Sequence, residues 1–216
     1  MLLNAFAMLA GSGGAPRAAI AMGQQEKEKT EKIMGNCFAL LLILAAILTT
    51  VFYLFAPQLL QAFGASEVTL PYAVEYARIY ILGSVFVLVV LGMNPFITTQ
   101  GFAKISMLTT VIGAVINILL DPVFIFVFDM QVRGAALATV ISQAVGAMWI
   151  LKFLSGKKTI LQLKKKNMRL EKTVILPCLA LGISNFTMLS TESILSISFT
   201  TSLARYGGDM AVGAMT

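Results

Sequence analysis

The sequence contains no histidine and little charge. Of its 216 residues, 12% are charged and 58% are hydrophobic, whereas a soluble domain carries about 25% charged residues. Without histidine, the chain has neither histidine-based catalysis nor histidine-ligated metal sites. The two cysteines, Cys37 and Cys178, lie far apart in apolar segments, which indicates packed thiols rather than a disulfide or a metal pair. This composition is typical of a polytopic membrane protein.

Hydrophobic segments follow one another along the whole chain. Each reaches or exceeds the roughly 20 residues that a membrane-spanning helix needs. The segments cover residues 1–22, 33–63, 71–100, 105–128, 134–154 and 171–203. We therefore predict an all-α polytopic membrane protein with six transmembrane helices. Within the third segment, Asn94-Pro95 predicts a kink or an early helix end, because proline cannot donate a backbone hydrogen bond.

Basic residues are concentrated in alternate connections. If residues 23–32 are cytoplasmic, strict alternation of the spans places 101–104 and 155–170 on the same side. Together with Arg17, Lys152 and Lys172 near the ends of the spans, this side then holds all but three of the 16 basic residues, the exceptions being Arg78, Arg133 and Arg205. Cytoplasmic loops of membrane proteins are enriched in lysine and arginine, so the asymmetry supports this orientation. Lysines and apolar residues are interleaved in 155–170, which favours an amphipathic connector at the membrane surface.

Asp121 lies in the segment 105–128, which is otherwise almost free of charge. A carboxylate at this depth costs on the order of 2.5 to 3.5 kcal/mol unless a partner stabilises it. Asn117 precedes it by four residues, so both side chains share one face of a helix. Pro122 frees a backbone carbonyl one turn earlier. Together these groups predict a site for a proton or a small hard cation, with a purely structural carboxylate as the alternative.

Glu192 is the other acidic residue well inside a span. Its neighbours, Leu189-Ser190-Thr191-Glu192-Ser193, include three hydroxyls, which either solvate a buried neutral acid or surround a functional one. Thr139 and Ser142 are further polar residues in the span 134–154. Hydroxyls of this kind usually bond within their own helix, so on their own they are weaker candidates.

Four stretches, in this order and spacing, resemble the multidrug and toxic compound extrusion (MATE) family. They are GGAPRAAIAMG at 13–23, NPFITTQGFAK at 94–104, GAVINILLDP at 113–122 and GAALAT at 134–139. The resemblance covers essentially the whole chain, and the last two stretches are the specific ones. It implies two lobes of six helices with alternating access, driven by Na⁺ or H⁺. The segments of this chain match the second to the seventh helix.

The resemblance also implies roles for particular residues. The family's first-lobe cation site uses an Asp on helix one, an Asn and an Asp on helix five, and a Thr on helix six. Asn117, Asp121 and Thr139 match the last three positions, whereas the helix-one aspartate has no counterpart here. Glu192 matches a coupling glutamate on helix seven. Thr98-Thr99 replaces a frequent arginine, and Ser184 replaces a usual proline.

These observations predict a cation-coupled antiporter that exports drugs or toxic organic compounds across the cytoplasmic membrane. Residues 1–154 are expected to form helices two to six of the N-terminal lobe. Residues 155–170 form the cytoplasmic connector, and 171–216 the first helix of the C-terminal lobe, so that this chain is a partial transporter. We expect no cofactor besides the coupling ion, and no enzymatic activity. The expected partners are a cationic or amphipathic organic substrate and membrane lipid, with no nucleic acid and a monomeric full-length form.

Three other functions are considered. A flippase for lipid-linked oligosaccharides or precursors, from the same superfamily, favours a cationic central cavity, whereas the spans here contain carboxylates. A non-transporting membrane scaffold stays open as an alternative. An intramembrane aspartyl protease needs two aspartates within the membrane, and only Asp121 qualifies.

Overall fold

The computed structural model describes residues 2–156 and 158–215, with side chains described up to Gly208. This part of the chain contains helices and turns but no strand. The α-helices are α1 (Leu2–Gly23), α2 (Lys27–Leu54), α3 (Ala56–Ala62), α4 (Leu70–Leu82), α5 (Ser84–Thr99), α6 (Ala103–Pro122), α7 (Gln131–Leu154) and α8 (Lys172–Met215). A π-helix (Val123–Val127) extends α6, and a 3₁₀-helix (Lys165–Met168) lies between α7 and α8.

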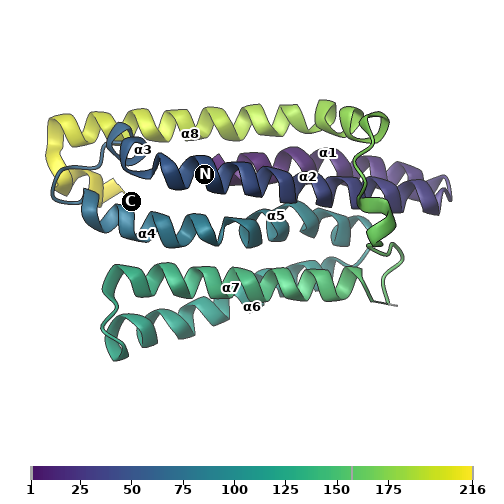
Figure 1. Cartoon of the computed structure of the whole chain (residues 1–216), viewed down its shortest axis with the longest axis horizontal. Helices are drawn as coiled ribbons and strands as arrows, with labels where there is room; N and C mark the ends of the chain where they lie inside the picture. Colours follow the sequence, from purple (N-terminus) through teal and green to yellow (C-terminus); the bar gives the residue numbers. More distant parts are fainter. Residues whose placement is uncertain (1, 157, 216) are drawn as a thin grey trace.

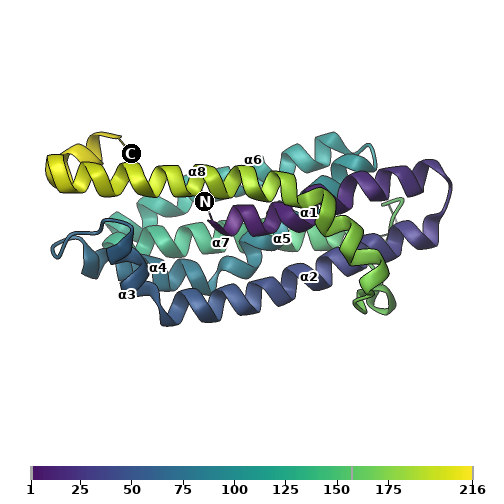
Figure 2. The same cartoon turned by 90° about the horizontal axis from the view of Figure 1, so that it is seen from above.

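Most of these helices are suited to span a membrane. By length and composition, four described stretches can cross it: α2, α6 with its π-helical extension, α7, and α8 up to Gly208. Helices α4 and α5 pass the same test only as a pair, which is bent by 54° and makes a fifth span if the pair counts as one. The first hydrophobic segment is α1, which packs against α8, α5 and α2 (Figures 1 and 2). The predicted all-α polytopic membrane fold is therefore confirmed.

Glycines let α1 approach three helices at once. A Cβ atom on Gly11 would lie 2.8 Å from a backbone oxygen of α5, too close for any real side chain. On Gly13 it would meet the carbonyl of Cys178 on α8, and on Gly14 the sulfur of Cys37 on α2. Such small residues allow close helix contact in membranes. Both cysteines are free and buried, which confirms the prediction of packed thiols.

A bend in the third hydrophobic segment lies at Gly83. Helices α4 and α5 meet there at 54°, and α5 continues through Pro95 to Thr99. The helix therefore does not end at the proline, and the kink predicted there stays a prediction. The structure gives a packing reason for the glycine, because Val140 of α7 fills the space where a Cβ atom on residue 83 would lie.

The connector, described over residues 155–156 and 158–170, is folded onto the ends of α2 and α5. Gln100, which directly follows α5, accepts hydrogen bonds through Oε1 from the Thr159 hydroxyl at 2.6 Å and the Leu161 amide at 2.9 Å. Leu161 is buried in the hydrophobic core. This apolar residue of the connector therefore packs against protein.

Two residues of α2 hold the rest of the connector. The carboxylate of Glu31 is paired with the ammonium of Lys164 at 2.7 Å. Asn36 donates to the carbonyl of Asn167 at 3.2 Å and accepts from the amide of Glu171 at 2.7 Å. As a result, the α1–α2 turn, the end of α5 and the connector gather at one end of the molecule (Figure 1).

Candidate functional site

Helix α6 places Asn117 and Asp121 one turn apart. Both side chains are half-buried, and Asn117 Nδ2 lies 3.5 Å from Asp121 Oδ1. Pro122 ends the α-helix, and the backbone continues as a π-helix. Because proline has no N–H, the carbonyl of Ile118 has no partner one turn on. Single π-helical turns are frequent at functional sites, so local backbone and side chains both mark this position.

Helix α7 brings Thr139 to the same place. Helices α6 and α7 lie side by side (Figure 1), and Gly134 allows the close approach, since a Cβ atom there would lie 2.9 Å from the backbone of Phe124. Thr139 Oγ1 accepts a hydrogen bond from Asn117 Nδ2 at 3.4 Å and donates to the carbonyl of Ala135 at 3.0 Å. The amide of Asn117 therefore bridges a carboxylate on its own helix and a hydroxyl on the next.

The chemistry of this cluster suits a hard cation or a proton. Carboxylate, amide and hydroxyl oxygens are hard donors. At 3.4 and 3.5 Å, the two bonds from Asn117 are at the weak limit of hydrogen bonding, so the side chains are not rigidly fixed. Asn117 presents the nitrogen of its side-chain amide to both partners. A cation would be bound by the amide oxygen instead, and rotating the side-chain amide by half a turn brings that oxygen to the same place. Protonation of Asp121 needs no such rotation.

A cavity of about 390 Å³, lined by both apolar and polar side chains, lies beside Asn117 and Thr139. Four different helices, α1, α4, α6 and α7, contribute its other polar side chains. These are Asn4, Tyr80, Thr109, Thr110, Ser142 and Gln143. Asn4 and Gln143 stand out in the sequence as amides within apolar segments. Nothing in the sequence marks Tyr80 as a cavity residue, since it reaches the cavity only through the packing of α4 against α7.

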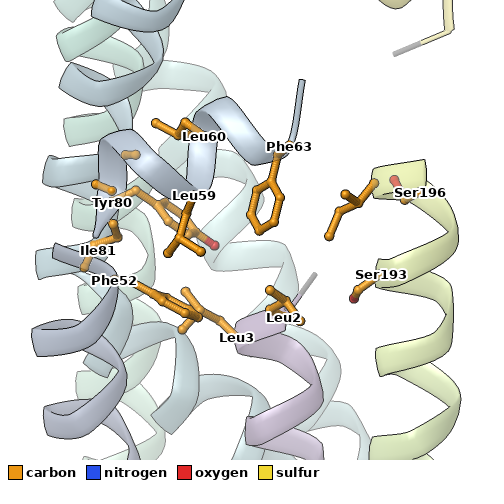
Figure 3. Close-up of a pocket in the computed structure, with 13 residues that line it drawn as sticks. Leu2, Leu3, Phe52, Leu59, Leu60, Phe63, Tyr80, Ile81, Ser193 and Ser196 are labelled. Carbon is orange, nitrogen blue, oxygen red and sulfur yellow. The ribbon is translucent and has the colours of Figure 1, made fainter. Parts of the chain in front are cut away.

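Glu192 is not part of this cluster. It is exposed on α8, which packs mainly against α1 and α2, whereas α6 packs against α5 and α7. Contacts connect α8 to α6 through α1 and α5, which lie between them in Figure 1. Its neighbours Ser193 and Ser196 line a second cavity of about 300 Å³, whose other lining residues are mostly apolar (Figure 3). The structure thus brings together three of the four candidate residues and leaves the fourth apart.

Apolar membrane helices that half-bury a carboxylate, an amide and a hydroxyl beside a partly polar cavity define a polytopic membrane protein with an intramembrane polar site. The chain belongs to the MatE family, whose model matches residues 1–123. This confirms the resemblance noted in the sequence.

Individual relatives agree with this assignment. Multidrug export protein MepA of Staphylococcus haemolyticus is 29% identical over 206 residues, covering 95% of this chain and 46% of MepA. An inward-facing multidrug resistance MATE family transporter of the MOP superfamily superposes with a TM-score of 0.94 at 25% identity, over 100% of this chain and 49% of that one. The MATE multidrug transporter DinF-BH, with a dye bound, superposes with a TM-score of 0.92 at 32% identity, over 100% of this chain and 48% of that chain. The chain spans about half the length of the curated relatives it matches. These matches are export proteins and transporters, in agreement with the expectation that the protein is not an enzyme.

Proposed function

We propose that this chain forms part of a cation-coupled antiporter that exports drugs or other toxic organic compounds across the cytoplasmic membrane. The observation that carries the proposal is the Asn117, Asp121 and Thr139 cluster on α6 and α7 of a MatE protein. On this proposal, residues 1–154 belong to the N-terminal lobe and 171–216 begin the C-terminal lobe. Residues 155–170 connect them on the cytoplasmic side.

Coupling rests on the charge of Asp121. A carboxylate within a span is costly when ionised and unpaired, and a proton or a Na⁺ ion removes that cost. The transported ion therefore stabilises whichever conformation holds it best, which is how a ligand shifts a conformational equilibrium. For Na⁺, the ligands are Asp121, Thr139 Oγ1 and the oxygen of Asn117 after its amide turns. Glu192, exposed on α8, is a separate coupling residue of the second lobe in this proposal.

The substrate proposed is a small cationic or amphipathic organic compound. Support comes from the export of multiple drugs in the name of MepA and from the dye bound to DinF-BH. The cavity beside Asn117 offers hydroxyl and amide groups, and no described lysine or arginine lines it. A flippase for anionic lipid-linked precursors favours a cationic lining, so this observation favours the exporter.

The test is efflux of a fluorescent organic cation from cells that express the full-length parent protein. Asp121→Asn is expected to abolish ion-driven efflux while membrane insertion stays normal. Asp129→Asn is the matched control, since Asp129 lies eight residues later in an exposed turn with φ of 51°, a conformation that asparagine also adopts. Unchanged ion-driven efflux in Asp121→Asn would remove Asp121 from the coupling site, and absence of efflux in the unaltered parent would favour the scaffold alternative.

A further inference from the structure

A groove lies at the connector end of α7. Trp149, Lys152 and Phe153 are spaced i, i+3 and i+4, so they share one face of the last two turns. With Gly156 and Lys158 from the following turn, they line a cavity of about 310 Å³. None of these residues takes part in the Asn117 cluster, and the proposed function assigns them no role.

Contacts with neighbouring elements fix the walls of the groove. The ring of Phe153 packs edge-on against Phe102, with centroids 5.2 Å apart and planes at 76°. The Leu163 amide donates to the carbonyl of Leu154 at 2.9 Å, and Gln162 Nε2 donates to that of Gly156 at 3.4 Å. The end of α7 and Gly156 are thus held against residues 162 and 163 of the connector.

The ammonium groups of the two lysines of the groove are not paired with a carboxylate among the described residues. Lys152 and Lys158 are exposed and make no ion pair with any other residue that the structure describes. Lys164, on the same connector, is instead neutralised by Glu31 at 2.7 Å. Two ammonium groups without acidic partners attract an anion.

The remaining surface of the groove is apolar and faces outward. Trp149 is 39% exposed and its neighbour Met148 is 60% exposed, on a helix long and apolar enough to cross a membrane. Tryptophan at the end of such a helix typically lies at the level of the lipid headgroups. An apolar wall beside two cationic groups fits a ligand with an anionic head and a hydrocarbon chain.

We propose that this groove binds one anionic phospholipid. The headgroup phosphate lies between Lys152 and Lys158, and an acyl chain lies along Trp149 and Phe153. The same end of the molecule holds the basic connector, and the positive-inside rule assigns that end to the cytoplasmic leaflet, which is rich in anionic lipid. The site does not depend on the proposed transport function.

Trp149 is the only tryptophan of the chain, so its fluorescence reports on the groove directly. The test reconstitutes the 216-residue chain in phosphatidylcholine nanodiscs that contain brominated phosphatidylglycerol or, at equal mole fraction, brominated phosphatidylcholine. Bromine quenches tryptophan at short range, and we expect stronger quenching by phosphatidylglycerol. In Lys152→Gln/Lys158→Gln the relative affinity for this lipid is expected to fall about 30-fold, or about fivefold for each lysine.

Lys165→Gln/Lys166→Gln is the matched control, because it removes the same charge from exposed lysines outside the groove. This pair is expected to keep the lipid preference, and an equal loss in both pairs would show a general effect of surface charge and overturn the site. Equal quenching by the two lipids in the unaltered chain also overturns it. If the glutamine pair misfolds by circular dichroism, Lys152→Arg/Lys158→Arg must retain the preference. Displacement by soluble glycerol phosphate would show a site for free phosphate and contradict the lipid assignment.

Discussion

Glu31 and Lys164, separated by 133 positions in the sequence, form an ion pair of 2.7 Å between α2 and the connector. The carboxylate side chain is only 4% exposed, whereas that of the lysine is 41% exposed. Glu31 also accepts a bond from the amide of Gln162 at 3.4 Å. The pair is therefore a buried acceptor covered by a partly exposed cation, and the two partners should respond differently to substitution.

Lys164→Ala is expected to lower the free energy of unfolding by about 2 kcal/mol, because it leaves a buried carboxylate without its charged partner. Lys166→Ala, at an exposed position with no partner among the described residues, should change it by less than about 0.5 kcal/mol. Denaturant titration in detergent micelles measures both. Equal effects would mean that the pair contributes nothing specific to connector docking.

Thr139→Val should weaken binding of the coupling ion in the full-length transporter by about tenfold, since it removes one hydroxyl that contacts Asn117. Thr187→Val is a matched control: its hydroxyl bonds to the carbonyl four residues earlier on α8, as that of Thr139 does on α7. The ion dependence of transport in proteoliposomes distinguishes the two. An unchanged ion dependence in Thr139→Val would remove this residue from the site.

Glu192→Gln is expected to impair efflux less than Asp121→Asn. The physical reason is that Asp121 is half-buried in a cluster with two polar partners, whereas Glu192 is exposed and distant from it. Efflux rates of the two variants of the full-length protein, normalised to their amounts in the membrane, give the order. The reverse order would move the main coupling site to the second lobe.

Gly13→Ala should destabilise the chain by about 1–3 kcal/mol, the usual range for an added group in a packed interior. The new methyl group would collide with the carbonyl of Cys178 and force α1 and α8 apart. At Gly23, a methyl group would find no other atom within 4 Å, so Gly23→Ala should be neutral or slightly stabilising. Thermal unfolding in detergent compares the two variants. Similar melting temperatures would argue against this helix contact.

Lys165→Cys is expected to resist an impermeant maleimide added outside intact cells and to react after permeabilisation. Lys165 is exposed on the connector, and both native cysteines are buried, so background labelling should be low. Glu67→Cys, in the loop between α3 and α4, is the control that should react from outside. Labelling in the opposite pattern would invert the proposed orientation.

The sequence alone was sufficient where the physics is local. The spacing of Asn117 and Asp121 predicted their contact because residues four apart meet on any helix. The contribution of Thr139 from α7 required the resemblance to known proteins, since no local rule pairs two helices. The basic 155–170 segment was recognisable as a connector, but its fold was not, because alternating lysines and apolar residues suit a membrane surface equally well.

Tertiary contacts explain what the sequence did not show. The bend at Gly83 accompanies a contact with Val140 on a helix far along the chain. Gln100 and Asn36 are ordinary polar residues near helix ends, and nothing nearby in the sequence marks them as acceptors for the connector. The polar side chains of the cavity beside Asn117 come from four helices, so their grouping emerges only after the helices have packed.

The hydrogen bonds between Asn36 and the connector couple the movements of α2 and α8. The Asn36 side chain binds the backbone at Asn167 and again at Glu171, and α8 begins at the very next residue, Lys172. Almost no free chain therefore separates the anchored point from the helix. Any tilt of α8 about its first turn pulls directly on α2, so the two helices cannot reorient independently at this end.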